Sequence, residues 1–250
     1  MNVALYGARG KRWAMTERGR SDLKCDSGML RIGPSCMSWG EDGLTIDIDE
    51  VAVPFPKRIK GQIKLYPSAV QPVAYPLDSS GMHLWQPIAP VANVEVNLSS
   101  PDLSWRGHGY FDRNAGGAPL EDAFQSWHWS RANIEKSATI FYDVTPRQGP
   151  ARGLALNINA QGQAEAIQPP ETARLATTGW RITRTTRSDA GTSPAIISTL
   201  EDTPFYARSV VSSRIAGRPA FSMHESLDLD RFRMPVVQAM LPFRMPRRAR

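Results

Sequence analysis

Short runs in which apolar and polar residues alternate are the feature that most constrains the fold of this 250-residue chain. Residues 44–49 alternate strictly, the pattern of a strand with one buried face. Similar runs recur at the spacing of about 8–12 residues that is typical of sandwiches and barrels. Glycine and proline separate them, and no segment before residue 235 has a convincing helical period. The sequence therefore predicts an all-β fold, with two barrel-like units and a border near residue 90.

The expected elements can be given by residue number. Strands are expected at 2–6, 12–16, 29–32, 36–39, 44–53, 59–65, 82–87, 93–98, 104–112, 138–144, 154–158, 164–167, 180–186, 196–200 and 205–211. A turn is expected at 7–10, and a short helical turn at 236–241 between two prolines.

Composition excludes several classes of protein. The net charge is +6, which favours an acidic partner or an anionic surface. Cys25 and Cys36 have neither a zinc spacing nor the number needed for a disulfide framework, so we expect free thiols. No apolar run reaches the roughly 18–20 residues that span a bilayer as a helix. Because Met1 leads directly into a strand, we expect this start to lie inside a larger domain.

The stretch 104–131 holds three of the seven tryptophans and two of the four histidines. On one strand face lie Trp105, Gly107, Gly109 and Phe111, and on the other lie Arg106, His108, Tyr110 and Asp112. The second face either meets water or lines a polar, aromatic pocket. Glycines inside a strand indicate close approach of another group. The pattern alone leaves both alternatives open.

Other clusters of polar residues carry weaker signals. The acids Asp47, Asp49 and Glu50 alternate with apolar residues, which favours a solvated strand face over a carboxylate site. A metal site from His108, Asp112 and His128 has no recognised spacing. A carboxylate pair of Asp112 and Asp143 is not selected by any spacing. Phosphate-binding glycine motifs and the Gly-x-Ser-x-Gly elbow are absent from the sequence.

Acid catalysis by one carboxyl in aromatic surroundings remains. Asp112 follows Tyr110 by two residues, and a carboxyl in an apolar pocket stays protonated near neutrality. Such an acid can protonate a carbon–carbon double bond, and aromatic faces can stabilise the carbocation by about 1–2 kcal/mol per ring. Water then captures the cation, and either His83 or the carboxylate of Asp112 removes the extra proton. This chemistry requires no cofactor and no metal.

Eight segments together resemble the bacterial carotenoid 1,2-hydratases, also called hydroxyneurosporene synthases. They are Asn2-Val-Ala-Leu-Tyr-Gly, Lys11-Arg-Trp-Ala-Met-Thr-Glu-Arg-Gly-Arg, Leu30-Arg-Ile-Gly-Pro, Ile46-Asp-Ile-Asp-Glu, His83-Leu-Trp-Gln-Pro-Ile-Ala-Pro, Trp105-Arg-Gly-His-Gly-Tyr-Phe-Asp, Trp127-His-Trp-Ser-Arg and Met240-Leu-Pro-Phe-Arg-Met-Pro-Arg-Arg. The resemblance covers essentially the whole chain. Relatives usually have a further segment before the first of these motifs.

The resemblance implies a cofactor-independent lyase that adds water to the terminal C1–C2 double bond of acyclic carotenoids such as neurosporene and lycopene. It implies paired lipocalin-like barrels: residues 1–90 as the C-terminal part of the first, 91–235 as the second, and 236–250 as a basic amphipathic tail. The family's His-x-Trp and Tyr-x-Asp pairs fall on His83 and Trp85 and on Tyr110 and Asp112. Asp112 is then the proton donor, and the other three shape the site.

The C-terminal segment 231–250 interleaves arginines with apolar residues and contains no acid. This pattern fits peripheral contact with an anionic membrane, while a solvated tail is the alternative. Through the resemblance we expect the cytoplasmic face of a bacterial intracytoplasmic membrane. No nucleic-acid-binding motif accompanies the charge, so we expect no nucleic-acid partner. A non-catalytic carrier of apolar ligands and a cyclase acting on a polyene or prenyl substrate remain as alternative functions.

Overall fold

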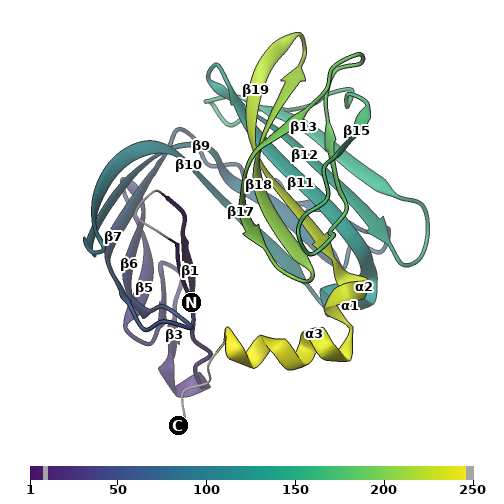
Figure 1. Cartoon of the computed structure of the whole chain (residues 1–250). Coiled ribbons are helices and arrows are strands. Elements are labelled where there is room, and N and C mark those ends of the chain that lie inside the picture. Colours follow the sequence, from purple (N-terminus) through teal and green to yellow (C-terminus); the bar gives the residue numbers. More distant parts are fainter. Residues whose placement is uncertain (8–10, 246–250) are drawn as a thin grey trace. The chain divides into compact units, whose positions relative to one another are not determined.

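The computed structural model describes residues 1–7 and 11–245, and most of them lie in antiparallel strands (Figure 1). The prediction of an all-β fold is confirmed. The helical segments of the described residues are short: η1 (Arg20–Asp22), α1 (Leu120–Ala123), α2 (Leu229–Phe232), α3 (Pro235–Met240) and η2 (Leu241–Phe243). The helical turn expected at 236–241 is thus present. The expected turn at 7–10 lies mostly outside the described residues.

The chain forms two compact units. Unit 1 contains Met1–Pro67, Ala92–Tyr110 and Ala239–Arg250, and unit 2 contains Ser68–Val91 and Phe111–Gln238. This division differs from the single border expected near residue 90. The reason is that two long strands, β9 (His83–Ser100) and β10 (Asp102–Gly116), each contribute residues to both units.

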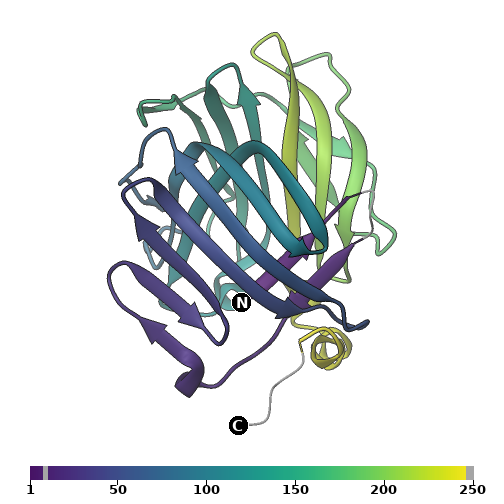
Figure 2. The same cartoon turned by 90° about the vertical axis from the view of Figure 1, so that its left-hand side faces the viewer.

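Unit 1 is built on one large antiparallel sheet and one hairpin. Besides parts of β9 and β10, its strands are β1 (Asn2–Leu5), β2 (Arg12–Met15), β3 (Leu23–Cys25), β4 (Met29–Ile32), β5 (Ser35–Gly40), β6 (Gly43–Val51) and β7 (Arg58–Pro67). The sheet has the order β10-β9-β7-β6-β5-β4-β3, with β8 (Tyr75–Pro76) on β9, and Figure 2 shows strands of this sheet face-on. The hairpin pairs β1 with β2, and Val3 and Ala14 pack on Ile48 and Ile59.

A buried ion pair also holds unit 1 together. The two guanidinium nitrogens Nη1 and Nη2 of Arg18 donate to the two carboxylate oxygens of Glu50 at 3.0 and 2.7 Å. The hydroxyl of Ser35 donates a further hydrogen bond to the carboxylate of Glu50, and Glu50 is only 1% exposed. The expectation of a solvated carboxylate is therefore wrong for Glu50. It holds better for Asp49, which pairs with the exposed Arg58.

Unit 2 is built on a second large sheet with the order β14-β13-β12-β11-β19-β18-β17. Its strands are β11 (Phe124–Ile134), β12 (Ser137–Pro146), β13 (Arg152–Ile158), β14 (Ala164–Ala166), β17 (Ala195–Asp202), β18 (Tyr206–Ile215) and β19 (Arg218–Asp228), with a hairpin of β15 (Thr172–Leu175) and β16 (Arg184–Arg187) beside it. Across the described residues, the strand order of each large sheet is open rather than closed into a ring.

The two faces of the unit 2 sheet have different partners. Because side chains alternate along a strand, His128 and Asp143 point to one face, while Trp127 and Tyr142 point to the other. The hairpin β15–β16 covers the first face, where Arg187 forms an ion pair with Asp143. The beginning of β9 covers the second face, and this arrangement positions the candidate site.

Most expected strands are present, with three differences. The expected strands at 82–87 and 93–98 form one strand, β9, and Pro87 and Pro90 lie buried within it. A proline is tolerated in a strand where the sheet does not need its nitrogen as a donor. Strands β3, β8, β11, β15 and β19 were not expected, and β16 begins four residues later than the strand expected at 180–186.

Both cysteines carry free thiols, as expected. No helix within 1–7 and 11–245 is long and apolar enough to cross a bilayer.

Candidate active site

Three of the four predicted site residues lie together in unit 2. His83 and Trp85 alternate at the start of β9 and are 3% and 0% exposed. Asp112 lies near the end of β10 and is half-buried. The indole Nε1 of Trp85 donates a hydrogen bond to the carboxyl Oδ2 of Asp112 at 2.8 Å. The His-x-Trp and Tyr-x-Asp motifs are thus joined by a direct contact between Trp85 and Asp112.

This contact favours one oxygen of Asp112 as the site of a proton. An indole N–H is a donor and never an acceptor, so Oδ2 is the accepting oxygen. The carbonyl-type oxygen of a carboxylic acid is the better acceptor, so this contact favours a proton on Oδ1. Asp112 can in this way donate a proton from Oδ1 while Trp85 holds the carboxyl group in one orientation.

Aromatic rings surround the Trp85–Asp112 pair. Tyr142 of β12 packs its ring perpendicular to that of Trp85, with centroids 5.5 Å apart. The ring of Tyr75 is tilted against the same indole, with centroids 5.9 Å apart. The ring contacts continue from Tyr142 to Trp127, then to Phe124 and then to His83. Such edge-to-face contacts fix ring orientation and present π faces that attract a cation.

The hydroxyl of Tyr142 is kept neutral by its surroundings. Burial is the largest cause that raises the pKa of Tyr142. Burial also raises the pKa of Tyr75. The Tyr142 hydroxyl lies 3.5 Å from Oδ1 of Asn114, at the long limit of a hydrogen bond. Both tyrosines are therefore uncharged donors beside the ring of Trp85.

Both ring nitrogens of His83 contact groups other than Asp112. Its Nδ1 lies 2.6 Å from Oδ2 of Asp78, and its Nε2 lies 3.0 Å from the carbonyl oxygen of Ala118. The sequence-based hypothesis that His83 accepts a proton from the captured water thus has a competitor at each ring nitrogen.

The remaining predicted residue and its neighbours are placed differently. Tyr110 is half-buried and is grouped with unit 1. Arg106 and His108 are exposed, and Arg106 forms an ion pair with Glu95. This strand face was expected either to meet water or to line a polar, aromatic pocket. Its first half meets water, whereas Asp112 at its end contacts Trp85. Gly109 is buried, and a side chain there would meet Leu65.

The weaker combinations do not form sites. Asp143 lies on the opposite face of the unit 2 sheet from Tyr142 and pairs with Arg187, so it cannot act with Asp112. His128 lies on that same opposite face, where it stacks on His224. Within the described residues, no three His, Cys, Asp or Glu side chains gather as metal ligands would.

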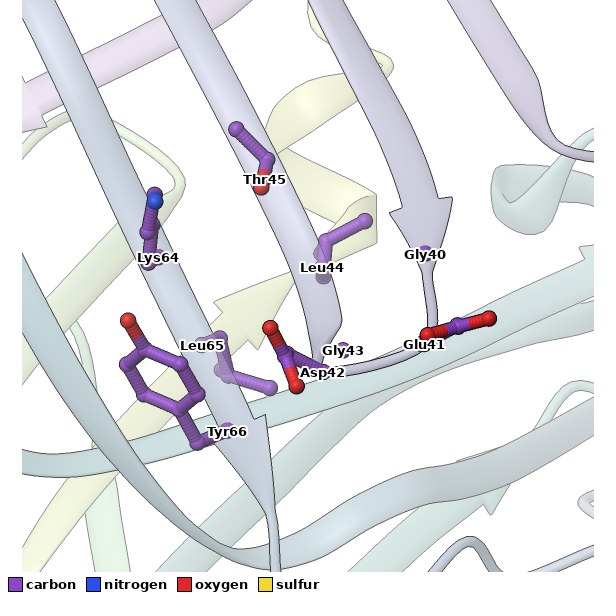
Figure 3. A pocket seen from close by; sticks show the side chains of 9 residues that line it. All are labelled: Gly40, Glu41, Asp42, Gly43, Leu44, Thr45, Lys64, Leu65 and Tyr66. Atoms are coloured by element: carbon purple, nitrogen blue, oxygen red, sulfur yellow. The ribbon is translucent and has the colours of Figure 1, made fainter.

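A surface hollow of about 130 Å³ lies elsewhere, in unit 1 (Figure 3). It adjoins the turn between β5 and β6, and its polar lining includes Glu41, Asp42, Lys64 and Tyr66. Glu41 and Asp42 are both exposed to solvent. The hollow contains none of the predicted site residues.

The geometry can be compared with known proteins. The family model of the carotenoid hydratase CrtC matches residues 1–250. The chain belongs to this family. The resemblance inferred from the motifs is thereby confirmed, and it extends over the whole chain rather than over the site motifs alone.

Three relatives of the CrtC family bear the name acyclic carotenoid 1,2-hydratase. The protein of Thiocapsa roseopersicina is 55% identical over 99% of this chain and 61% of its own length. That of Rubrivivax gelatinosus is 44% identical over 100% of this chain and 62% of its own length. The protein of Cereibacter sphaeroides is 41% identical over 99% of this chain and 88% of its own length. The chain thus spans about three fifths of the first two relatives.

A solved structure supports the fold. The crystal structure of a protein assigned as AttH, from Nitrosomonas europaea, matches with a TM-score of 0.58 over 87% of this chain and 74% of that chain. The sequence identity is 14%, so this likeness concerns the fold alone.

Several residues of the site were not predicted from the sequence. Asp78 lies five residues before His83, in a segment rich in proline, serine and glycine that was interpreted only as a loop. Tyr142 lies in a strand that is buried on both faces over most of its length, so alternation gave no sign of a functional side chain. Phe124 and Tyr75 likewise had no pattern that distinguishes them from core residues.

Proposed function

We propose that this chain is a cofactor-independent hydratase, which adds water to the terminal C1–C2 double bond of an acyclic carotenoid such as neurosporene or lycopene. Membership of the CrtC family supports the reaction class. The observation that carries the mechanism is the hydrogen bond between Trp85 and Asp112 within a group of aromatic rings. Because the chain spans only part of several relatives, activity of this length of chain belongs to the proposal.

The reaction begins with protonation of the double bond. Oδ1 of Asp112 gives its proton to C2, the π bond breaks, and the positive charge develops on C1. This carbon carries two methyl groups, so the cation is tertiary. The faces of Trp85 and Tyr142 attract the charge, each contributing about 1–2 kcal/mol when desolvated.

Water capture completes the reaction. A water oxygen forms the new bond to C1, and the resulting oxonium loses one proton to a base. The substrate gains one hydrogen at C2 and one hydroxyl at C1, and the acid is restored when the base is the carboxylate of Asp112.

The identity of the product tests this proposal. The full chain is supplied with lycopene in ¹⁸O-labelled water, and the products are separated and weighed by mass spectrometry. A hydratase gives a hydroxylated carotenoid with one ¹⁸O atom. Unchanged lycopene that co-purifies with the chain indicates a carrier, and an unhydrated isomer with a new ring indicates a cyclase.

We also propose peripheral contact with the cytoplasmic face of an intracytoplasmic membrane through the C-terminal segment. Its exposed apolar side chains support the proposal, with Val236 60% and Phe243 80% exposed. The arginines serve different roles: Arg231 bonds to backbone carbonyls, and Arg244 stacks on Trp13. Arg247, Arg248 and Arg250 lie outside the described residues.

Binding to anionic liposomes tests the membrane contact. Removal of residues 247–250 should weaken binding and reduce its salt dependence, because each basic residue contributes about 1 kcal/mol near an anionic surface. Phe243→Ser should weaken binding at every salt concentration. Unchanged binding in both variants would mean that this segment is solvated.

A further inference from the structure

Asp78 forms a compact set of hydrogen bonds around the ring of His83. Its Oδ2 accepts from Nδ1 of His83 at 2.6 Å and from the backbone N–H of the same residue at 3.0 Å. Its Oδ1 accepts from the hydroxyl of Ser80 and from the backbone N–H of Met82. The carboxyl group and the ring are both mostly buried, with 12% and 4% of the side chains exposed.

The partners of His83 decide how many protons its ring carries. A carboxylate oxygen and a backbone carbonyl oxygen are both acceptors. Burial alone would raise the pKa of Asp78, but the hydrogen bonds that its carboxylate accepts from Ser80, His83 and Met82 lower it. Asp78 is therefore a carboxylate at neutral pH. With an acceptor at Nδ1 and another at Nε2, the ring donates from both nitrogens only as an imidazolium.

The same contacts tie together the two chain segments that carry the site. Nε2 of His83 bonds to Ala118, two residues beyond the end of β10, and the N–H of Gly117 donates to the carbonyl of Met82 at 3.1 Å. A side chain at Gly116 would lie 2.5 Å from the ring of His83, so this approach requires glycine. The start of β9, with Trp85, is thereby fixed against the end of β10, with Asp112.

The geometry points to Asp78 as a positioning residue, which holds His83 as an imidazolium and thereby aligns Trp85 with Asp112. The effect of Asp78 on catalysis rests on the proposed hydratase function, whereas the protonation of His83 does not. Besides Asp78, the groups that face the His83 ring in the described contacts are the Ala118 carbonyl, the Gly116 backbone and the ring of Phe124. None of these carries a charge or takes up a proton.

This inference changes the assignment of the base. An imidazolium has no lone pair on either nitrogen, so His83 cannot accept the proton of the captured water. Asp112, left as a carboxylate after it protonates C2, then takes that proton and returns to its acidic form. One carboxyl group both gives and recovers the proton, and His83 acts through alignment alone.

The protonation state of His83 can be measured without any substrate. The full chain is labelled with ¹⁵N-histidine, and the ring nitrogens are observed by long-range ¹H–¹⁵N correlation near neutral pH. The His83 signals are assigned from their loss in His83→Gln. We expect both ring nitrogens at the shifts of protonated nitrogens in the native chain. An unprotonated nitrogen at this pH would overturn the inference.

The positioning role is tested with Asp78→Asn. We expect one ring nitrogen of His83 to lose its proton and kcat to fall about 10- to 100-fold, the effect of a misaligned acid, with KM changed far less. Asp143→Asn is the matched control, because it breaks a carboxylate–cation pair on the opposite face of the same unit. It should lower thermal stability and leave kcat per folded molecule near that of the native chain.

The outcomes separate this inference from the proposed function. If the native chain yields no hydrated product, the NMR measurement alone still decides whether Asp78 holds an imidazolium. If the chain is active and Asp78→Asn keeps full kcat, the positioning role is wrong. If Asp78→Asn does not fold, Asp78→Glu retains the charge, and we expect it to keep both ring nitrogens protonated; a neutral His83 ring there contradicts the pairing.

Discussion

Trp85 and Asp112 are joined by a hydrogen bond of 2.8 Å from the indole Nε1 to the carboxyl Oδ2. The two residues lie 27 positions apart in sequence, on different strands. Trp85 therefore has two separable roles in the proposed reaction: its N–H orients the acid, and its ring attracts the carbocation.

Trp85→Phe separates these roles, because it removes the N–H and keeps an aromatic ring. A hydrogen bond to an acidic group contributes about 1.5–3 kcal/mol, so we expect kcat/KM to fall by about 10- to 100-fold. Steady-state assay with lycopene measures the loss. Trp105→Phe, at a tryptophan that is 45% exposed, is the control and should behave as the native chain does. Full activity of Trp85→Phe would show that the N–H does not orient the acid.

Tyr142 distinguishes an aromatic role from a role of its hydroxyl. Its ring packs on both Trp85 and Trp127, while its hydroxyl makes only a long contact with Asn114. We expect Tyr142→Phe to keep at least about a third of the native kcat, and Tyr142→Leu to lose about tenfold or more because a π face is removed. Circular dichroism checks that both variants are folded. Equal losses in the two variants would assign the effect to the hydroxyl instead.

The burial of His224 leads us to expect that unit 2 loses folding stability as the pH falls. Burial, together with the charges of His128 and Arg184, lowers the pKa of His224 from the ordinary value of 6.5 to about 4, against the effect of a hydrogen bond to Thr185. The folded protein therefore favours neutral His224, whereas the unfolded chain binds a proton below about pH 6.5. The stabilisation is complete above about pH 6.5 and is lost as the pH falls toward 4, by about 3 kcal/mol in total.

Denaturant unfolding between about pH 7 and 4 measures this loss. His224→Gln removes the titrating group and keeps a donor for the Thr185 carbonyl. We expect a flatter dependence of the unfolding free energy on pH in this variant. An equally steep dependence would mean that other groups, rather than His224, cause the acid sensitivity.

The buried ion pair of Arg18 and Glu50 predicts the stability of unit 1. Both side chains are almost fully buried, at 2% and 0% exposure. Glu50→Gln leaves the guanidinium of Arg18 without its counter-charge, which costs about 3–5 kcal/mol. Asp49→Asn, beside the exposed Arg58, should cost about 1 kcal/mol or less. Hydrogen exchange in β6 reports both changes, and similar costs in the two variants would contradict this account.

The sequence predicted the strands better than the contacts between them. Alternation located β6, and runs of strand-forming residues bounded by proline located β7 and β12. Glu50 was grouped with the acids of the solvated face, although alternation places it on the same face as Leu44 and Ile48. Its partner Arg18 lies 32 residues away, so no local pattern shows the ion pair.

The candidate site was predicted only in part, because contacts between residues that are far apart in the sequence leave no local pattern. Motifs identified His83, Trp85 and Asp112, whereas Tyr142 and Asp78 became visible only through packing and hydrogen bonding. The protonation of His83 likewise depends on two acceptors that come from separate segments. No local pattern encodes such a convergence.

Replacement of Asp112 tests the central claim most directly. Asp112→Asn keeps an acceptor oxygen for the Trp85 N–H and removes the transferable proton. In cells that supply lycopene, with both chains present in equal soluble amounts, we expect the variant to form at least about 100-fold less hydroxylated carotenoid than the native chain. Formation of the hydroxylated product at the native level by Asp112→Asn would contradict the assignment of Asp112 as the acid.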